Sequence, residues 1–275
     1  MASSTTKKTG PGSEHLIKSK ERVRDLAEVY TAEREVRAML DLVPDFSLAQ
    51  TFLEPACGNG NFLIEILRRK LRAHSATRTY FERDKDGRLA PFPKGGKAEE
   101  IVLLAIQAVA TLYGFDICPN NIAETQVRLY AYVMYGEDLL LPGFLTGSDP
   151  HTLNYIESVT PGHGLALAPD YEGNLFRFAD KTARLKNTHE RAATISPLLR
   201  ASLKLVLGQN FKQGDFLAQQ DLAGQPLRVG KWTFLAGKVR REDFLLSDVG
   251  TDSPKPVSVL SLRSLTDFVK GAGNA

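Results

Sequence analysis

The sequence predicts an α/β fold built on a parallel sheet, with helices on its N-terminal side and a long insertion. Three observations predict it. A short apolar strand runs through a glycine-rich turn into a helix around residue 60, and a second strand and helix follow over residues 112–135. The composition, with 43% hydrophobic and 24% charged residues, is that of a globular chain with a core. Strands that alternate with helices favour parallel pairing, because parallel neighbours need a crossover connection.

Composition excludes several function classes. The net charge of +3 permits a nucleic-acid partner without requiring one. No apolar run reaches the roughly 18 residues of a membrane span, and the N-terminus lacks the apolar core of a secretory signal, so we expect no membrane contact. Only Cys57 and Cys118 are present, which predicts a cytoplasmic location without a disulfide framework. The five histidines show no metal-ligand spacing, so we expect no metal site.

The N-terminal part predicts the opening of a nucleotide-type α/β unit. Residues 1–13 have no hydrophobic periodicity and predict a flexible tail. Apolar residues at helical spacing predict helices within residues 13–43, the second over 33–43 and ended by Pro44. Residues 50–54 predict a buried strand, followed by a turn over 55–61 and a helix over 62–72.

The next part repeats the strand–helix order after an interruption. Residues 75–97 are polar and predict an excursion, with a hairpin through 78–83 and 88–92. A helix is expected over 99–112, a second strand over 112–117 and a helix over 119–135, with Pro119 suited to its first turn.

The C-terminal half is less regular. Residues 137–198 are rich in proline and glycine and predict a functional insertion, unless they hold elements that the pattern does not reveal. Ordered structure is expected again at 203–207 and 210–217, and a β-hairpin at 227–235 and 239–246. We therefore assign one domain to residues 14–246. A C-terminal helical segment is expected over 247–275, with its helix at 257–270.

The turn after the first strand carries the strongest chemical signal. Gly58 and Gly60 permit a sharp turn and a close approach of the backbone to a ligand. The helix that follows begins with free N–H groups and a partial positive charge, suited to a carboxylate or phosphate. A tight turn of the kind found in any α/β protein is the alternative. The chain has neither Gly-x-Gly-x-x-Gly nor Gly-Lys-Ser/Thr, which disfavours pyrophosphate binding of the NAD or ATP kind.

Two aspartates follow later strands. Asp116 ends the second strand, where a carboxylate accepts hydrogen bonds from ribose hydroxyls in dinucleotide folds; the alternative is an ordinary helix cap before Pro119. Asp215 can accept from the exocyclic amino group of adenine, beside the ring face of Phe216. A surface turn is the alternative interpretation of residues 214–215.

Together these segments resemble S-adenosylmethionine-dependent N6-adenine DNA methyltransferases, in particular the methylation subunits of restriction–modification systems. Residues 54–62 (EPACGNGNF) look like motif I of that family, and residues 27–31 (AEVYT) are similar to its motif X, departing from it at Ala27 and Ala32. Residues 114–117 (GFDI), with Asn120, Asn121 and Arg128, resemble motif II, and residues 213–217 (QGDFL) resemble motif III. The resemblance implies a Rossmann-like class I methyltransferase sheet, in truncated form because little chain follows Leu217.

The resemblance also implies a cofactor site for S-adenosylmethionine. Tyr30 and Thr31 would lie near the methionine end of the cofactor, and the first turn would line its backbone and carboxylate. Asp116 would hold the ribose, and Asp215 with Phe216 the adenine. The implied cofactor-binding residues are Tyr30, Thr31, Glu54, Pro55, Ala56, Gly58, Gly60, Asp116, Ile117, Asp215 and Phe216.

One part of the family pattern is missing. The family's catalytic signature is Asn/Asp-Pro-Pro-Tyr/Phe, which holds and stacks a flipped adenine, and this chain has no Pro-Pro dipeptide. We therefore expect an S-adenosylmethionine-binding component of an adenine-specific DNA methyltransferase, with DNA as a partner. Its catalytic loop and target recognition would come from a second subunit or from an unusual site in this chain. The alternatives are a non-catalytic regulatory or assembly subunit that binds cofactor or DNA, and a small-molecule methyltransferase with residues 137–198 as a lid.

The predicted C-terminal hairpin also allows two interpretations. Its aromatic residues could stack on a base while its cationic residues meet phosphates, or the aromatics could belong to the core beneath a charged, solvated surface. The aromatics are Trp232, Phe234 and Phe244, and the cations are Arg228, Lys231, Lys238, Arg240 and Arg241.

Overall fold

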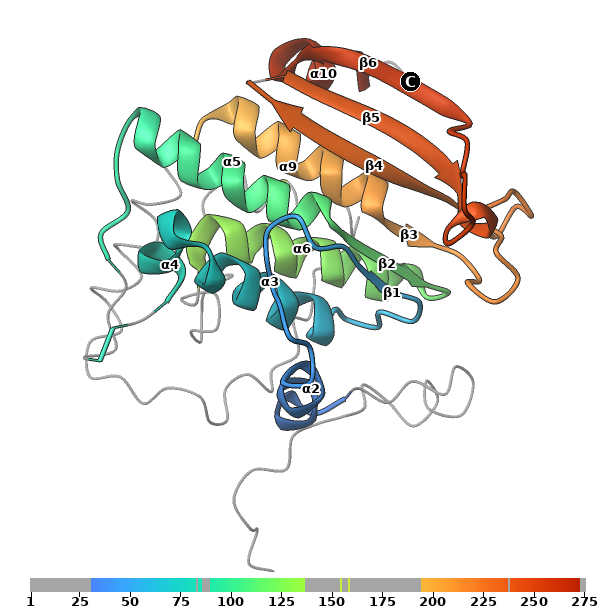
Figure 1. Ribbon diagram of the computed structural model, residues 1–275, viewed down its shortest axis with the longest axis horizontal. Coiled ribbons are helices and arrows are strands. Elements are labelled where there is room, and N and C mark those ends of the chain that lie inside the picture. Colours follow the sequence, from blue (N-terminus) through green and yellow to red (C-terminus); the bar gives the residue numbers. More distant parts are fainter. Residues whose placement is uncertain are drawn as a thin grey trace, which may run out of the picture.

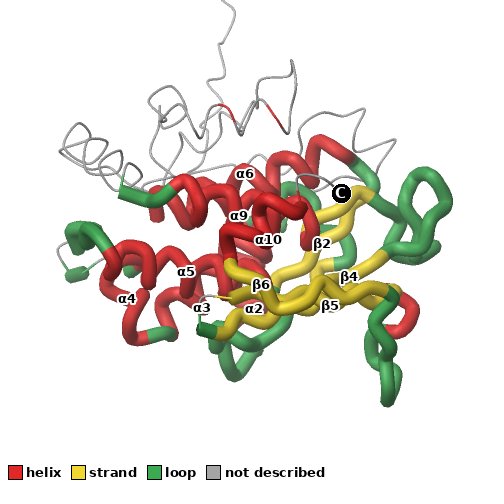
Figure 2. The backbone as a smooth tube through the Cα atoms, turned by 90° about the horizontal axis from the view of Figure 1, so that it is seen from above, coloured by secondary structure: helices red, strands yellow, loops and turns green. Residues whose placement is uncertain are grey.

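The computed structural model describes residues 31–82, 84–85, 90–136, 154, 158, 194–236 and 238–272, and it confirms the mixed α/β class (Figures 1 and 2). In this part of the chain the strands form two three-stranded sheets, one of order β1-β2-β3 and one of order β4-β5-β6. The strands are β1 Phe52–Glu54, β2 Leu112–Asp116, β3 Phe211–Gln213, β4 Arg228–Leu235, β5 Lys238–Leu245 and β6 Ser258–Ser264. The helices are α2 Glu33–Leu40, α3 Asn61–Ala73, α4 Ser75–Phe81, α5 Gly96–Ala110, α6 Pro119–Tyr135, α9 Pro197–Asn210, the 3-10 helix η4 Leu246–Asp248, and α10 Leu265–Ala272.

The first sheet is parallel, as the alternation of strands and helices predicts. Strand β2 lies in the centre, with Phe52 of β1 opposite Leu112 and Phe211 of β3 opposite Gly114. Residues 112–115 are all buried, which is typical of a central parallel strand covered on both faces. Because the strands are parallel, their carboxyl ends, and the loops that follow, meet at one edge of the sheet.

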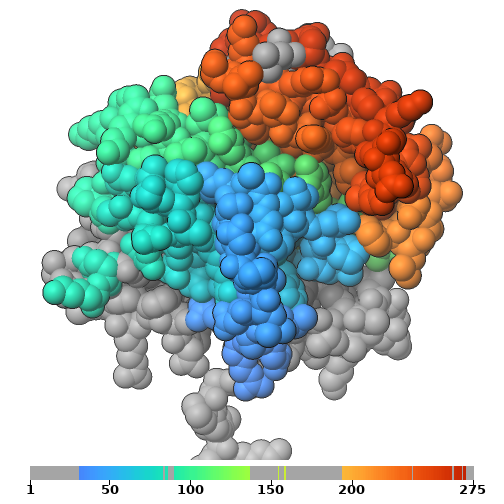
Figure 3. Space-filling model, in the orientation of Figure 1, coloured from blue at the N-terminus to red at the C-terminus, as the bar shows by residue number. Residues whose placement is uncertain are grey.

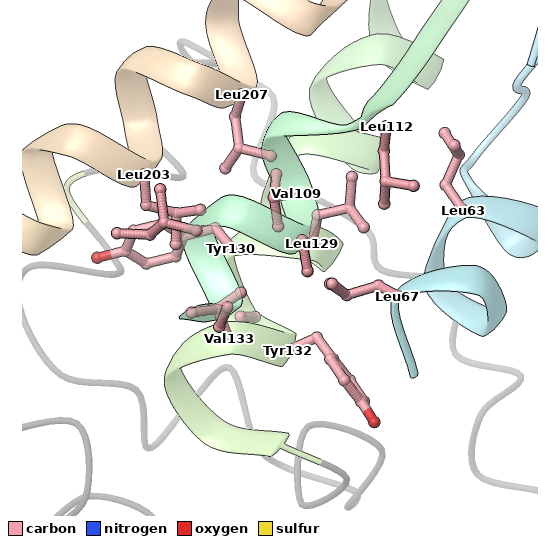
Figure 4. Packing of buried hydrophobic residues seen from close by; sticks show 14 of the residues in the cluster. Leu63, Leu67, Val109, Leu112, Leu129, Tyr130, Tyr132, Val133, Leu203 and Leu207 are labelled. Atoms are coloured by element: carbon pink, nitrogen blue, oxygen red, sulfur yellow. The ribbon is translucent and has the colours of Figure 1, made fainter. Parts of the chain in front are cut away.

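The core surrounds α6, whose residues 121–135 are all buried. Apolar residues of α3, α5 and α9 pack around this helix, as the close-up in Figure 4 shows for Leu67, Val109, Leu129 and Leu203. Pro119 occupies the first turn of α6 as the sequence predicts, because its missing N–H has no partner there in any helix. A helix with apolar residues on every side must be covered by neighbours, so α6 fixes the positions of the elements around it.

The second sheet is antiparallel and packs against the side of β2 on which Tyr113 lies. The predicted hairpin is confirmed, with Thr233 of β4 opposite Arg240 of β5. Two hydrogen bonds, the first buried and the second partly buried, attach the hairpin to the rest of the fold: the Tyr113 hydroxyl donates to the Gly230 carbonyl at 2.5 Å, and Trp232 Nε1 donates to Asn210 Oδ1 at 2.8 Å. The two sheets therefore belong to one packed body.

Two secondary-structure predictions are wrong. The expected helix over 257–270 is a strand, β6, over its first half, and only Leu265–Ala272 is helical. Residues 258–264 form a strand because β5 supplies backbone partners along its free edge. The expected hairpin strand over 78–83 is replaced by helix α4, whose Thr77 hydroxyl donates to the Leu71 carbonyl at 2.5 Å.

Some predictions fall outside the described residues. These are the flexible tail over 1–13, the first N-terminal helix, the second strand of the expected hairpin around residues 88–92, of which only 90–92 are described and as loop, and almost all of the insertion over 137–198. Within the described residues, no helix is long and apolar enough to cross a membrane.

Candidate functional site

The candidate site lies at the edge of the parallel sheet where β1, β2 and β3 end. The turn after β1 spans residues 55–60, β2 ends at Asp116, and Gly214 follows β3. Backbone bonds hold these three ends together: Cys57 N donates to the Phe115 carbonyl at 2.9 Å, and Gly214 N donates to the Asp116 carbonyl at 3.0 Å. The three segments singled out in the sequence are therefore neighbours in space.

Asp116 points its carboxylate at the glycine turn. Its Oδ2 accepts from the backbone N of Gly58 at 2.9 Å. Its Oδ1 accepts from the backbone N of Cys118 at 2.8 Å and from the side-chain amide of Asn121 at 3.3 Å. Helix α6 has Cys118 as its N-cap residue and no side-chain cap, so the helix-cap interpretation of Asp116 is wrong: Oδ1 closes a turn onto Cys118, while Oδ2 joins β2 to the glycine turn. A carboxylate offers about four acceptor positions, so this half-buried group can still take a ligand donor.

The glycines of the turn are required by its conformation. Gly58 and Gly60 both have left-handed backbone angles, with φ of 52° and 83°. A Cβ on Gly60 would lie only 2.9 Å from Thr125 Oγ1. That hydroxyl donates to the Gly58 carbonyl at 3.1 Å, so α6 presses directly against the turn.

A buried arginine fixes the far side of the same turn. Arg128 of α6 is 6% exposed, and its Nη1 donates to the Asn59 carbonyl at 2.5 Å and to Asn61 Oδ1 at 2.9 Å. The amide nitrogen of Asn61 in turn donates to the Thr31 carbonyl at 3.0 Å. Thr31, predicted to contact the cofactor, therefore lies against the turn; Tyr30 is outside the described residues.

Sequence reasoning missed Thr125 and Asn59 as members of the site. A signal for Thr125 was present, because Asn121, Thr125 and Arg128 recur at spacings of four and three residues on an otherwise largely apolar helix. These spacings place three polar side chains on one helical face, which here is the face against the turn. Asn59 carries no comparable signal, because its burial depends on the fold of the turn.

The amino end of α3 opens onto the turn and has unsatisfied polar groups. No side chain caps this end, whose N-cap residue is Gly60. Asn59 is 8% exposed, and its Oδ1 has no hydrogen-bond partner among the described residues. A buried acceptor without a partner is costly, and a helix amino end favours negative charge. The arrangement suits a ligand that carries both a donor and an anionic group.

Two ionisable groups beside the turn, Glu54 and Cys57, have pKa values shifted toward their neutral forms. Burial raises the pKa of Glu54, although the backbone N–H of Ala56 partly opposes that shift. Burial and the neighbouring Asp116 carboxylate raise the pKa of the Cys57 thiol, so this cysteine stays protonated at neutral pH. A thiol is a poor nucleophile and metal ligand, so Cys57 is suited to neither role.

Residues after β3 behave partly as predicted. Asp215 is exposed, and its Oδ1 accepts from the backbone N–H groups of Leu217 and Ala218 at 2.9 and 3.0 Å, which is the surface-turn alternative. The ring of Phe216 lies 5.9 Å from that of Phe115 and packs beside the small cluster around Leu227. Phe216 is thus half-buried rather than free.

Other predicted residues are exposed at the same edge. Pro55 and Ala56 in the turn are exposed, and Ile117 is 52% exposed beside Asp116. The Ile117 carbonyl accepts from Gln213 Nε2 at 2.9 Å, which ties the ends of β2 and β3 together once more. An exposed apolar residue beside an aspartate can meet the ring of a nucleoside.

The hairpin aromatics Trp232 and Phe234 belong to the core. Both pack against the main hydrophobic cluster, and the Arg241 guanidinium lies 5.3 Å from the Trp232 ring. The Trp232 N–H is used by Asn210. The stacking interpretation is therefore wrong for these two rings.

In the part of the chain that the structure describes, no group of three or more His, Cys, Asp or Glu side chains could hold a metal ion. Comparison with known proteins gives no family by which to name the site, because no family model, no curated protein and no solved structure matches this chain.

Proposed function

We propose that this protein binds S-adenosylmethionine at the edge of its parallel sheet and is the cofactor-binding component of an adenine-specific DNA methyltransferase of the restriction–modification type. One observation carries the proposal: the Asp116 carboxylate meets the left-handed glycine turn directly, through its bond with Gly58 N. The sequence resemblance supplies the choice of cofactor and reaction. The three-stranded parallel sheet is compatible with a truncated Rossmann-like class I methyltransferase sheet.

The methionine end of the cofactor fits the unsatisfied groups of the turn. Its carboxylate would be favoured at the uncapped amino end of α3, where the helix carries partial positive charge. Its ammonium group would supply the donor that Asn59 Oδ1 lacks. Thr31, held by Asn61, would line the same end.

The nucleoside end fits the ends of β2 and β3. Asp116 would accept from the ribose hydroxyls. Ile117 is an exposed apolar contact for the adenine ring, and Asp215 keeps Oδ2 without a hydrogen bond from any described residue, which leaves it able to accept from the adenine amino group. Phe216 is half-buried against Phe115, so it would pack beneath the adenine site and would not stack on the adenine with an open ring face.

The chemistry of the proposed reaction divides between the cofactor and two proteins. The cofactor supplies the methyl group on its sulfonium sulfur, and this chain binds and orients it. The absence of a Pro-Pro dipeptide leads us to propose that another polypeptide supplies the catalytic loop and target recognition. The same absence favours one alternative, a non-catalytic regulatory or assembly subunit that binds cofactor or DNA.

Isothermal titration with S-adenosylmethionine and with its demethylated product tests the proposal. We expect one site per chain, and a loss of affinity of roughly tenfold or more in Asp116→Ala, the scale of one or two charge-assisted hydrogen bonds. Asp221→Ala is the matched control, because Asp221 also accepts backbone N–H groups in a turn but lies outside the site. Circular dichroism checks that each variant is folded. Absence of heat with either ligand in a folded wild-type sample refutes the proposal.

Methyl transfer distinguishes the two versions. The methyltransferase version predicts that labelled methyl reaches adenine in DNA only when the native partner, identified by co-purification, is added. If the reconstituted complex binds cofactor and DNA but never transfers methyl, the non-catalytic version holds.

A further inference from the structure

Positive charge is concentrated in the antiparallel sheet. Strands β4, β5 and β6 contain six lysines and arginines against two carboxylates, a balance of +4. The whole chain has a net charge of +3, so the remainder of the protein is slightly acidic. A sheet that carries more than the entire net charge points to an anionic partner.

Strand register shows which charges share a face. Gly230 and Trp232 of β4 lie opposite Asp243 and Arg241 of β5, and these pairs face the interior, where Arg241 and Asp243 are buried and ion-paired at 2.5 Å. Because side chains alternate along a strand, the intervening pairs lie on the opposite face. We call this the outer sheet face: Lys231 with Glu242, Thr233 with Arg240, and Leu235 with Lys238.

The outer sheet face is open to solvent. Lys231, Lys238 and Arg240 are all exposed. Helices α9 and α10 lie on the inner side of the sheet in the backbone tube of Figure 2, and the orange surface of the strands faces the viewer in Figure 3. Successive rows of this face are about 7 Å apart, because each is two residues further along an antiparallel strand. The cations are thus spread along a ladder of three rows.

Little within the sheet neutralises these cations. Glu242 is the one carboxylate on the face, and it bonds Arg240 at 2.7 Å. Lys231 and Lys238 have no ion-pair partner among the described residues. On the neighbouring strand, β6 places Val259 beside Glu242 and Ser264 beside Lys238, which adds no acid.

We propose that the outer sheet face binds the phosphate backbone of DNA. Lys231, Lys238 and Arg240 would contact phosphates, and the Thr233 hydroxyl lies beside Arg240 as a further donor. Such contacts position a duplex without reading its sequence, which leaves target recognition to other parts of a complex. The choice of DNA among polyanions rests on the proposed function. The charge and the exposure of the outer sheet face are independent of that function.

Fluorescence anisotropy with a labelled duplex of about 20 base pairs, without cofactor and at salt between about 50 and 200 mM, tests the inference. The test variant is Lys231→Glu with Lys238→Glu. Its matched control is Lys255→Glu with Lys270→Glu, which makes the same change in net charge at two exposed lysines away from the face. We expect at least a tenfold loss of affinity in the test variant and a much smaller loss in the control.

Salt dependence gives a second readout. Each lost phosphate contact reduces the slope of log affinity against log salt by about 0.9, so the test variant should lose up to about 1.8 from the wild-type slope. Equal losses in the test and control variants would mean that net charge alone matters, which overturns the inference. Wild-type binding to phosphatidylserine vesicles but not to the duplex also overturns it, in favour of a lipid surface.

The result of the DNA-binding test can be distinguished from the result of the cofactor titration. Titration with the demethylated cofactor should be unchanged in both double variants, since none of their four lysines lies at the edge of the parallel sheet. Cofactor binding without DNA binding would refute this inference alone. Face-dependent DNA binding without cofactor binding would refute the proposed function alone.

Discussion

Replacing Gly60 by alanine is expected to destabilise the protein by about 2–5 kcal/mol. Two effects contribute to this free energy of unfolding. An L-residue at φ of 83° costs about 1–2 kcal/mol because its Cβ crowds the backbone. The added Cβ would also lie 2.9 Å from Thr125 Oγ1 and 3.0 Å from Thr125 Cγ2, and forcing a methyl group into such a site costs about 1–3 kcal/mol.

A second glycine separates the two effects. Gly224 has φ of 75°, close to that of Gly60, but a Cβ there would meet nothing within 4 Å. Gly224→Ala should therefore show the backbone cost alone, about 1–2 kcal/mol. Urea unfolding followed by circular dichroism gives both free energies, and the difference between them measures the contact with Thr125.

The contact can also be removed from the other side. In the double variant Gly60→Ala with Thr125→Ala, the two nearest atoms, Oγ1 and Cγ2, are gone and only the Cβ of residue 125 remains at 3.3 Å, so the two substitutions should show a favourable coupling of about 1 kcal/mol. If Gly60→Ala costs no more than Gly224→Ala, and no coupling with Thr125 appears, then α6 does not press on the turn and the geometry of the site described above is wrong.

Three further perturbations address other parts of the fold. Arg128→Met removes the donor to the Asn59 carbonyl and Asn61 Oδ1. It should lower the free energy of unfolding in urea by about 2–4 kcal/mol and weaken the binding of cofactor in titration, whereas Arg128→Lys should restore part of the stability and part of the affinity. Burial lowers the pKa of Lys70 to about 7 in the folded protein, against about 10.4 in an unfolded chain. Between these two pH values the unfolded state binds one more proton than the folded state. The free energy of unfolding should therefore rise across this pH range by up to about 1.4 kcal/mol per pH unit. That rise should vanish in Lys70→Met, and equal pH profiles for the two proteins would contradict the shift. Trp232→Phe leaves Asn210 Oδ1 without its donor and should cost about 1–3 kcal/mol in thermal or urea unfolding; no loss would mean that the hairpin is not anchored there.

The elements predicted well from sequence are those whose residues determine their own environment. Strand β2 and helix α6 contain enough apolar residues to require burial wherever they lie, and Pro119 marks where the helix begins. The β4–β5 hairpin could be predicted from its alternating pattern, although β5 begins at Lys238, opposite Leu235, one residue earlier than predicted. In each case the signal is local.

The failures share the opposite property. Residues 258–264 become a strand only because β5 presents an unpaired edge, a partner more than ten residues away that the local pattern does not show. Helix α4 is polar, and its sequence 75–81 resembles a loop until Thr77 bonds to α3 and Phe81 is buried. Tertiary context decides both segments, as it does for weakly patterned sequence in general.

The candidate site shows the same division. Gly58, Gly60 and Asp116 could be predicted because strand ends meet at one edge in any parallel sheet. The contacts that shape the turn could not, since Arg128 reaches Asn59 across 69 residues of sequence, and the missing partner of Asn59 Oδ1 exists only after folding. The motifs thus locate the candidate site, while the contacts that Asn59 and Arg128 make within it appear only in the folded chain.

The antiparallel sheet links the two proposed surfaces mechanically. Its inner face is attached to β2 by the hydrogen bond between Tyr113 and Gly230. The next residue, Gly114, permits close packing of β2 against the turn after β1 and against α3, because a Cβ there would lie 3.1 Å from both Cys57 and Leu63. Its outer face carries the free lysines. If both proposals hold, a duplex on that face would be fixed relative to the glycine turn through a few rigid contacts, as the proposed methyl transfer to one base would require.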